Sequence, residues 1–284
     1  MSVMALGSLL LILSAVLHAA WNALAKGSRD KESLIFLMTA LSGVFTLALI
    51  LILDGGFKAV APMAFVFAIL SGIFEGLYLG SLSNALKDAA LGQAYAIMRG
   101  GAMVFVWLVS TLFLREQAQL IQYLGALLIF AGLMVLNVRG GKPAQEKRSH
   151  NIGAYLCAFF ISGYHICYHQ ALVLDADPKS LFLISMVVSL PFLIWGLGRD
   201  FKSRVTKAWS EQRGRALLTG FFSTASFLIF LYGLQVSAPG YAISLRNSSI
   251  FFAIVFSFFL KESLTRVQIV GAGVIGIGTI LLSL

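Results

Sequence analysis

The sequence predicts an all-α membrane protein with ten transmembrane helices, arranged as two inverted five-helix repeats. Three observations lead to this prediction. The 284-residue chain is 59% hydrophobic and only 12% charged, whereas a soluble chain is about 45–50% apolar and about 25% charged. It contains ten apolar runs, each long enough to cross a bilayer as a helix. Its second half repeats its first. The composition excludes a soluble enzyme and a disordered protein.

The ten apolar runs define the predicted helices in chain order. Inside a bilayer each run must be helical, because unpaired backbone groups find no water there. We interpret the first run as a retained helix rather than a cleaved signal, because no basic segment precedes it and polar residues interrupt it. The runs cover residues 3–25, 33–53, 62–84, 90–114, 119–138, 151–174, 180–198, 215–235, 239–260 and 265–284.

An internal repeat relates the two halves of the chain. Residues 92–138 fall on 238–284 without a gap when shifted by 146 positions. The first and sixth runs align with a shift of 147, which pairs His18 with His165. Matches at polar and aromatic positions argue against the chance similarity that any two apolar sequences share.

The repeat predicts how the chain is organised in the membrane. We expect one five-helix repeat over 1–138, a basic linker loop over 139–150 and a second five-helix repeat over 151–284. An odd number of helices per repeat makes the second repeat enter the membrane from the opposite side. Inverted repeats are typical of secondary transporters, whose substrate site lies near the midplane between the halves.

The positive charge of the chain predicts its orientation. The net charge is +9, but most Lys and Arg residues lie in loops, which argues against a nucleic-acid partner. The loops on one side carry 16 of the 21 basic residues, and the other side carries 3. The positive-inside rule then places both termini outside the cytoplasm. We expect a multi-pass protein of the inner (plasma) membrane, with the lipid bilayer as a partner.

Three charged residues lie well inside apolar runs, namely Glu75, Arg99 and Arg246. Each costs roughly 2.5–3.5 kcal/mol at the centre of a helix on insertion scales, so each is expected to face a partner or a water-filled path. Two guanidinium groups in one cavity favour a carboxylate, phosphate or phosphonate. Alternatively, each Arg pairs only with helix-end carbonyls or with Glu75. Glu75 itself either carries a proton for transport or is a fixed counter-ion to Arg99.

Polar and aromatic residues at helical spacing complete the candidate substrate site. Those of the first and sixth runs match across the repeat, and others lie within one turn of Arg99 or Arg246. The alternative is plain hydrogen bonding between helices; the preferred interpretation is a cavity lining that includes histidines able to transfer protons. The set comprises His18, Trp21, Asn22, Tyr95, His165, Tyr168 and Asn247.

No pattern predicts an enzyme, a metal site or a cofactor. His165 and His169 have the i, i+4 spacing of zinc ligands, but the sequence suggests no third ligand. The chain contains no GxSxG, HExxH or GxxxxGK[ST] motif, so neither intramembrane hydrolysis nor direct ATP drive is expected.

Three features outside the cavity carry predictions of their own. Apolar and basic residues mix over 199–214, which indicates either an amphipathic helix on anionic lipid or a solvated basic loop. Glu262 lies at a loop turn, where a solvated or capping role is favoured. Gly72, Gly76 and Gly80 form a stripe of small residues that lets another helix approach closely.

Three short segments of the chain resemble a known family. His18-Ala19-Ala20-Trp21-Asn22, Tyr95-Ala96-Ile97-Met98-Arg99-Gly100 and Arg246-Asn247-Ser248-Ser249 resemble the drug/metabolite transporter superfamily, in its EamA-type ten-helix branch. The resemblance covers essentially the whole chain. It implies transport of a small metabolite through a cavity lined by the first, third, fourth, sixth, eighth and ninth helices, with the fifth and tenth peripheral. A narrower likeness is to membrane proteins associated with phosphonate-utilisation operons.

The chain departs from that family in two ways. The family often has a proline where Ala102 and Ser248 stand, which puts a hinge at those positions in doubt. Many relatives are thought to keep both termini in the cytoplasm, whereas the loop charges here predict the opposite.

We therefore predict a secondary transporter that moves a small anionic or zwitterionic metabolite, of phosphonate, carboxylate or amino-acid type, by alternating access. The main alternative is a proton-coupled exporter of cationic or hydrophobic drugs, with Glu75 as the binding acid. A lipid-modifying enzyme and a non-transporting receptor are disfavoured. The sequence leaves open the substrate, the direction, the coupling ion and the oligomeric state, including a homodimer.

Overall fold

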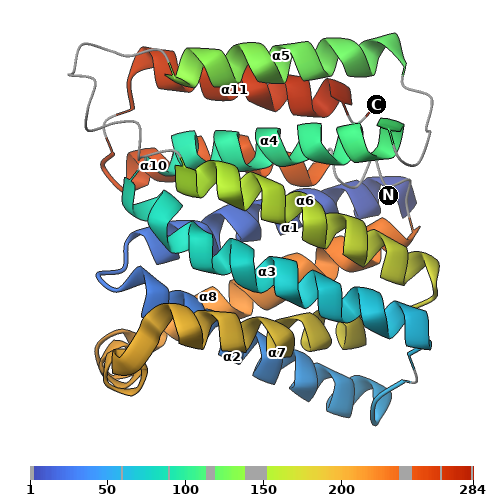
Figure 1. Cartoon of the computed structure of the whole chain (residues 1–284), viewed down its shortest axis with the longest axis vertical. Coiled ribbons are helices and arrows are strands. Elements are labelled where there is room, and N and C mark those ends of the chain that lie inside the picture. The colour runs from blue at the N-terminus through green and yellow to red at the C-terminus, as the bar shows by residue number, and fades with distance from the viewer. Residues whose placement is uncertain are drawn as a thin grey trace.

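The computed structural model of the chain describes residues 3–58, 60–88, 90–112, 119–137, 152–236, 245–262, 264–282 and 284. Within these ranges the regular structure is helical, with no strand. The predicted linker loop over 139–150 and two parts of the internal repeat, 113–118 and 237–244, lie outside the described residues. The helices, labelled as in Figure 1, are α1 (Val3–Lys26), α2 (Lys31–Leu49), α3 (Pro62–Asp88), α4 (Leu91–Leu112), α5 (Leu120–Asn137), α6 (Ile152–Val173), α7 (Pro178–Leu197), α8 (Phe201–Val236), α10 (Ser249–Phe259) and α11 (Arg266–Leu282).

Several helical stretches are long and apolar enough to cross a membrane. By length and composition they are Gly7–Lys26, Lys31–Asp54, Pro62–Lys87 and Pro178–Gln235. The last stretch contains both α7 and α8, because only a short 3-10 helix, Gly198–Asp200, separates them. Shorter apolar helices cover Leu120–Val135, Leu245–Phe259 and Arg266–Leu282. The chain is a multi-pass membrane protein.

The packing of the helices follows the internal repeat. The pairs α1–α8, α2–α8 and α1–α10 have counterparts in α6–α3, α7–α3 and α6–α4. Three further pairs, α2–α7, α4–α10 and α5–α11, join each helix to its own counterpart. In Figure 1 the helices lie side by side along one direction, with α5 and α11 forming a layer at the edge of the bundle. Most contacts between the halves therefore have a repeat-related equivalent; α4 also contacts α11, without an equivalent contact between α5 and α10 among these pairs.

Corresponding helices run in opposite directions. The amino group of Lys26, at the end of α1, donates to the Leu86 carbonyl 2.5 Å away. A Cβ on Gly153, at the start of α6, would lie 2.9 Å from the Ala85 backbone nitrogen. The end of α1 and the start of α6 therefore meet at the same end of the molecule. We call this the basic end, because it corresponds to the side predicted to carry 16 of the 21 basic residues. Both chain termini lie at the other end in Figure 1.

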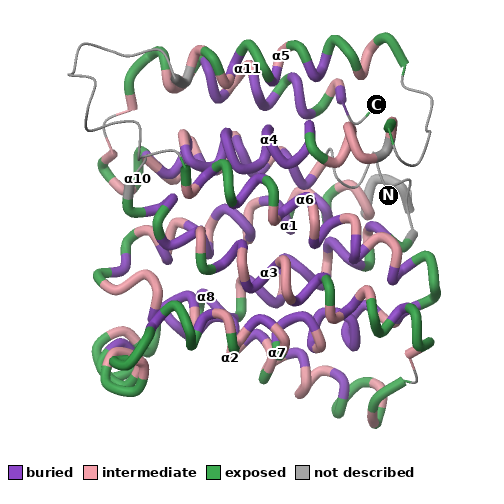
Figure 2. Tube along the Cα trace, viewed as in Figure 1, coloured by how far each residue is buried: buried purple, intermediate pink, exposed green. Residues whose placement is uncertain are grey.

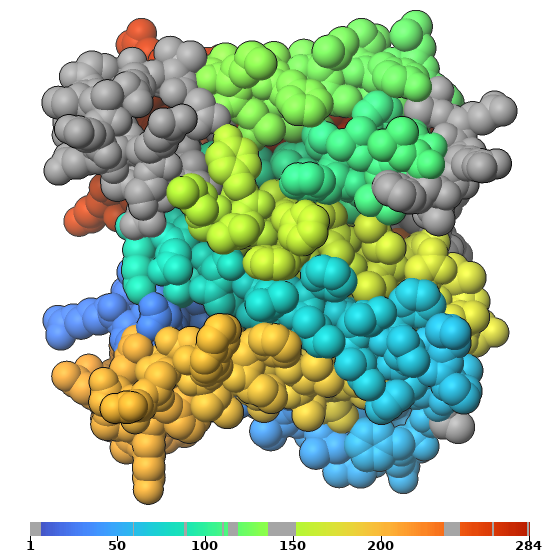
Figure 3. Space-filling model, viewed as in Figure 1, coloured from blue at the N-terminus to red at the C-terminus, as the bar shows by residue number. Residues whose placement is uncertain are grey.

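Burial separates an inner bundle from a peripheral pair. Figure 2 shows buried residues concentrated along α1, α3, α4 and α6, whereas exposed residues line the outer side of α5. Those exposed residues are apolar, for example Leu127 at 63% and Met134 at 71%, as expected for a surface that meets lipid chains. On the face in Figure 3 the side chains of α3, α4 and α6 form a continuous surface.

The predicted glycine stripe on α3 contacts α7 at two of its three positions. A Cβ on Gly72 would lie 2.9 Å from the Ser185 carbonyl oxygen, and one on Gly76 would meet the ring of Phe192 at the same distance. Gly80 has no such neighbour within 4 Å. The absence of side chains at Gly72 and Gly76 lets α7 lie against α3 beside Glu75.

The basic segment at the start of α8 is helical, but its apolar side faces the protein. The ring of Phe201 packs edge-on against Phe36 of α2 with centroids 4.9 Å apart, and Ala208 is buried. The backbone of Gln212 (φ −134°, ψ 26°) then leaves the helical region and separates this segment from the apolar part of α8. The alternative in which this segment lies on lipid is therefore wrong for Phe201 and Ala208, because both pack against the protein instead.

Candidate functional site

The centre of the bundle holds a cluster of polar side chains around His18. On α1, His18 is fully buried; its Nε2 contacts an Nη2 of Arg99 from α4. Its Nδ1 lies 3.3 Å from Nη2 of Arg246 and 3.3 Å from the indole Nε1 of Trp21. Arg99 and Arg246, one from each repeat, therefore converge on one imidazole ring.

A second layer of hydrogen bonds fixes α1 against α4 beside this ring. The hydroxyl of Tyr95 donates to the His18 carbonyl at 3.0 Å. The amide of Asn22 donates to that same carbonyl at 2.9 Å and to the Tyr95 hydroxyl at 2.7 Å. Because all three polar groups are buried, the bonds hold the two helices in register at the level of Arg99.

Arg246 is enclosed by aromatic rings rather than by acceptors. Its guanidinium carbon lies 3.9 Å from the centroid of Phe230 and 4.4 Å from that of Phe227, both on α8. Such contacts attract a cation to the face of a ring. Its Nε and Nη1 have no hydrogen-bond partner among the described residues.

Neither central arginine has a carboxylate partner in the described part of the chain. The ion pairs there involve neither Arg99 nor Arg246, although their exposed fractions are only 2% and 0%. An unpaired charge buried in an apolar interior costs several kcal/mol. The arrangement therefore offers hydrogen-bond donors and positive charge, and lacks an anion.

Glu75 pairs with hydroxyl groups instead of with an arginine. Its Oε2 accepts from the hydroxyl of Ser185 on α7 at 2.9 Å and from the hydroxyl of Tyr168 on α6. The expectation that Glu75 is a fixed counter-ion to Arg99 is wrong, because these two donors hold the carboxyl on the side of α3 that faces α6 and α7.

The remaining predicted residues lie near the centre and have no hydrogen bond to either arginine in the described part of the chain. His165 is buried against the Phe230 ring, with centroids 5.6 Å apart, and its Nε2 has no partner among the described residues. The amide nitrogen of Asn247 is likewise buried without a described partner. The hydroxyl of Tyr168 donates a hydrogen bond to Glu75. The structure thus brings together His18, Trp21, Asn22, Tyr95, Arg99 and Arg246, and places His165, Tyr168 and Asn247 around them.

Sequence reasoning missed four residues of this region. Tyr164, Phe227, Phe230 and Ser185 all contact predicted site residues. Tyr164 has a buried hydroxyl without a described partner and a ring 4.7 Å from that of His165, which directly follows it in the chain. Phe227 and Phe230 have i, i+3 spacing, which could have indicated one shared face. Nothing in the pattern distinguished Ser185 from other helix serines.

Ion pairs close the bundle at its basic end. Arg204, in the first part of α8, contacts Asp30 through two bonds of 2.9 and 2.6 Å and Glu32 at 2.8 Å. Lys87 at the end of α3 bonds Glu32 at 2.6 Å. Burial raises the pKa of Asp30, but hydrogen bonds from Arg204 and Ser33 outweigh it and leave the pKa below the usual range. We call Asp30, Glu32, Lys87 and Arg204 the basic-end latch.

A second group of ion pairs closes the opposite end. The amino group of Lys179 lies 3.0 Å from Asp54, 3.6 Å from Asp177 and 2.7 Å from the Tyr232 hydroxyl. Lys58 adds a contact of 3.7 Å to Asp177. These residues, which we call the opposite-end latch, tie the π-helical turn after α2 (Ile50–Asp54), the start of α7 and α8 together. The charged latches lie at the two ends and the arginine cluster lies between them.

Glu262 caps a helix, which is one of the two roles that the sequence left open, and the helix is α4 rather than its own. Its carboxylate accepts from the backbone N–H of Leu91, the first residue of α4, at 2.8 Å, and pairs with Lys26 at 3.3 Å. A carboxylate at a helix start satisfies one of the free N–H groups and favours the helix dipole.

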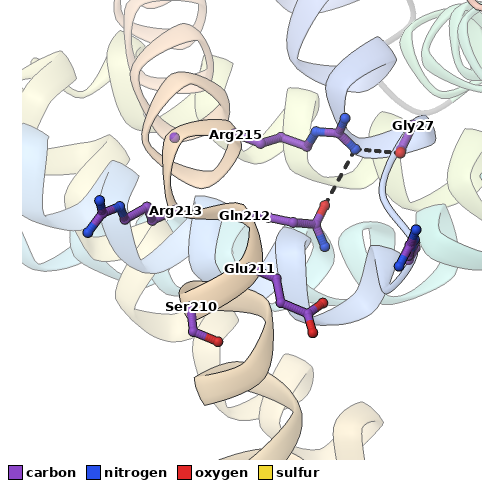
Figure 4. Close-up of a pocket in the computed structure, with 8 residues that line it drawn as sticks. Gly27, Ser210, Glu211, Gln212, Arg213 and Arg215 are labelled. Atoms are coloured by element: carbon purple, nitrogen blue, oxygen red, sulfur yellow. Dashed lines mark hydrogen bonds between the residues drawn. The ribbon is translucent and has the colours of Figure 1, made fainter.

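An open pocket at the basic end is separate from the central cluster. It has a volume of about 680 Å³ and lies between the α1–α2 connection and the bend of α8. Figure 4 shows Arg215 reaching across it to the Gly27 carbonyl, while Arg213 points away on the other side of α8. Because its arginines do not converge, the pocket is not the predicted anion site.

Comparison with known proteins identifies the family. The sequence model of the EamA-like transporter family matches the chain twice, over residues 5–138 and 149–284. The chain belongs to the EamA-like transporter family. The two matches correspond to the two halves related by the internal repeat, and membership indicates a membrane transporter. One solved crystal structure of a protein superposes on this member with a TM-score of 0.64 at 16% identity, over 98% of each chain, which supports the fold.

Proposed function

We propose that this protein is a secondary transporter that moves a small anionic or zwitterionic metabolite by alternating access. The observation that carries the proposal is the pair of buried arginines, Arg99 and Arg246, without a carboxylate partner in the described residues. A substrate with a carboxylate, phosphate or phosphonate group supplies the missing anion. Trp21, Asn22, Tyr95, His165 and Asn247 shape the rest of the site.

The membrane arrangement belongs to the same proposal. Ten spans form two inverted repeats, with the site near the midplane and a latch at each end. Both latches are formed among the described residues, which supports a mechanism in which access to the site requires a latch to open. Opening one latch at a time gives access to one side at a time.

The antiparallel repeats and the loop charges support an orientation with the basic end in the cytoplasm of a bacterial-type inner membrane. A reporter fused to the C-terminus checks it. We expect activity from a reporter that works outside the cytoplasm; activity from one that works only in the cytoplasm would reverse the orientation.

Export of cationic drugs fits the site less well. A cation in the centre would lie close to two guanidinium groups, and like charges repel strongly where water is absent. Glu75, the one buried acid among the described residues, already accepts hydroxyl bonds from Ser185 and Tyr168. We assign Glu75 the role of proton-coupling group, because a carboxyl between two hydroxyls remains bonded with or without its proton.

The proposal is tested by ligand-induced stabilisation followed by transport. The purified protein is heated with methylphosphonate, acetate and glycine, and separately with tetraphenylphosphonium, because a specific ligand raises the melting temperature with its concentration. Arg99→Gln and Arg246→Gln are compared with Arg213→Gln, which alters an exposed arginine outside the site. We expect anions to stabilise the wild type and the Arg213 variant only, and the stabilising anion to cross proteoliposome membranes unchanged.

A different result would redirect the assignment. Stabilisation by tetraphenylphosphonium that survives both central arginine changes and disappears in Glu75→Gln would support a drug exporter. Anion stabilisation in folded Arg99 and Arg246 variants equal to that of the wild type would remove the central site from the proposal.

A further inference from the structure

The imidazole of His18 lies between side chains that can only donate hydrogen bonds. Arg99 faces its Nε2, and Arg246 together with Trp21 faces its Nδ1. A neutral imidazole has one N–H and one acceptor nitrogen, whereas guanidinium and indole groups have no acceptor. In either tautomer one ring N–H therefore points at another donor, and a protonated ring would have two such contacts.

The mismatch indicates that His18 is a poor substitute for an anion. A group with an acceptor atom in place of each ring nitrogen would satisfy Arg99 and Arg246 at once. One carboxylate or phosphonate group meets this requirement, because two of its oxygens are about as far apart as the two nitrogens of imidazole. A longer dianion with a charged group at each end does not fit between guanidinium groups that touch opposite sides of one ring.

We propose that His18 is a placeholder that the substrate displaces, and that one anionic group of the substrate binds both arginines in its place. This inference rests on the proposed function and narrows its substrate class to compounds with a single compact oxyanion head. Rotation about the side-chain bonds of His18 moves the ring aside while α1 stays in place. The free Nε and Nη1 of Arg246 then face the head group, and the rings of Phe227 and Phe230 continue to flank the guanidinium.

The displacement has a measurable consequence for affinity. A ring that competes with the substrate lowers the apparent affinity by the fraction of molecules in which the site is free. If the displaced conformer is populated to roughly a tenth, removing the ring tightens binding about tenfold. A residue that only supports the site, or that bonds the substrate directly, would show weaker binding after the same change.

The experiment measures dissociation constants by calorimetry for methylphosphonate and acetate, which have one head, and for succinate, which has two. The variants are His18→Ala and, as a control, His169→Ala, which removes a histidine of α6 outside the proposed site. We expect His18→Ala to tighten binding of a single-headed anion and His169→Ala not to. Arg99→Gln and Arg246→Gln should each weaken binding by about 30-fold or more, with the double variant little worse than either, since one head binds both.

Weaker binding in folded His18→Ala, or additive losses in the two arginine variants, would overturn the inference and leave the transporter assignment intact. Tighter binding of succinate than of both single-headed anions in the wild type would do the same without any variant, should His18→Ala fail to fold. Absence of anion binding and flux in the wild type would instead overturn the proposed function itself, and this inference with it.

Discussion

Asp30 and Asp177, which are 147 positions apart, play the same structural part at opposite ends of the molecule. Each caps a helix by accepting the backbone N–H three residues later, from Ser33 at 3.2 Å and from Ser180 at 3.0 Å. Each also pairs with a basic residue, Arg204 for Asp30 and Lys58 for Asp177. The internal repeat therefore places equivalent helix caps in both latches.

The latches differ in charge at their central residue. Glu32 bonds two cations at the basic end, and Lys179, at the equivalent position of the second repeat, bonds two carboxylates at the other. Because the two latches share no residue, each can be opened separately by changing its own residues. This provides a direct check on alternating access.

We predict that Arg204→Gln and Lys179→Gln open opposite ends. Hydrogen–deuterium exchange should rise in the segment around residues 27–33 for the first and around 54–58 for the second, because local opening follows the loss of ion pairs. Lys207→Gln, which removes only an exposed contact to Glu211 at 4.0 Å, is the control. Increased exchange at the same end in both variants would contradict two independent latches.

The basic-end latch is also predicted to weaken in acid. The folded-state pKa of Asp30 lies below its usual range, so its contribution is fully present above about pH 4 and is lost as the pH falls through the lowered value. Asp30→Asn should destabilise the protein by about 1 kcal/mol or less at pH 7, the scale of a partly exposed ion pair, because asparagine still caps the helix.

Thermal unfolding of the wild type and Asp30→Asn from pH 7 to pH 2 measures this effect. We expect the difference in melting temperature to stay constant down to about pH 4 and to shrink below it. A difference that stays constant down to pH 2 would show that the carboxylate charge of Asp30 contributes nothing to stability.

The sequence indicated the fold well because membrane-spanning helices appear in it as long apolar runs. Apolar runs located the helices, and the repeat in polar positions such as His18 and His165 indicated two related halves; the family model likewise matches the chain twice. The latches were not predicted, since Asp30, Arg204 and Lys179 read as ordinary loop charges. Their pairing depends on which helix ends meet, and that becomes apparent only in three dimensions.

The same limit applies to the candidate site. Buried charge identified Arg99, Arg246 and Glu75, because such residues are costly in lipid and stand out from it. Pairing could not be read from spacing, so Glu75 was assigned to Arg99 as one alternative although its partners are Tyr168 and Ser185. Residues that act through a ring face, such as Phe230, are indistinguishable in sequence from those that face lipid.

We predict that Gly125 is required for the peripheral pair α5–α11. A Cβ there would lie 2.5 Å from the Leu282 backbone nitrogen and 2.8 Å from the Gly278 carbonyl oxygen, so Gly125→Ala forces the helices apart. The cost should be about 1–3 kcal/mol, as for other overpacked contacts. Gly273→Ala, with nothing within 4 Å of its Cβ, is the control on α11.

The two glycine variants are compared by melting temperature and by anion affinity. Because α5 and α11 supply none of the residues of the proposed site, Gly125→Ala should lower the melting temperature and leave the dissociation constant unchanged. Equal melting temperatures for the two variants would contradict the close approach of the helices.

Glu75 provides the sharpest test of proton coupling. Glu75→Gln keeps an oxygen that accepts from Tyr168 and Ser185, so the local packing survives while the titratable group is lost. We expect this variant to bind the anion as the wild type does and to exchange it across proteoliposome membranes, but to lose acceleration of flux by an imposed proton gradient. Tyr168→Phe, which removes one donor and keeps the carboxyl, should still respond to the gradient. If Glu75→Gln responds as strongly as the wild type, the coupling proton travels on another group or with the substrate.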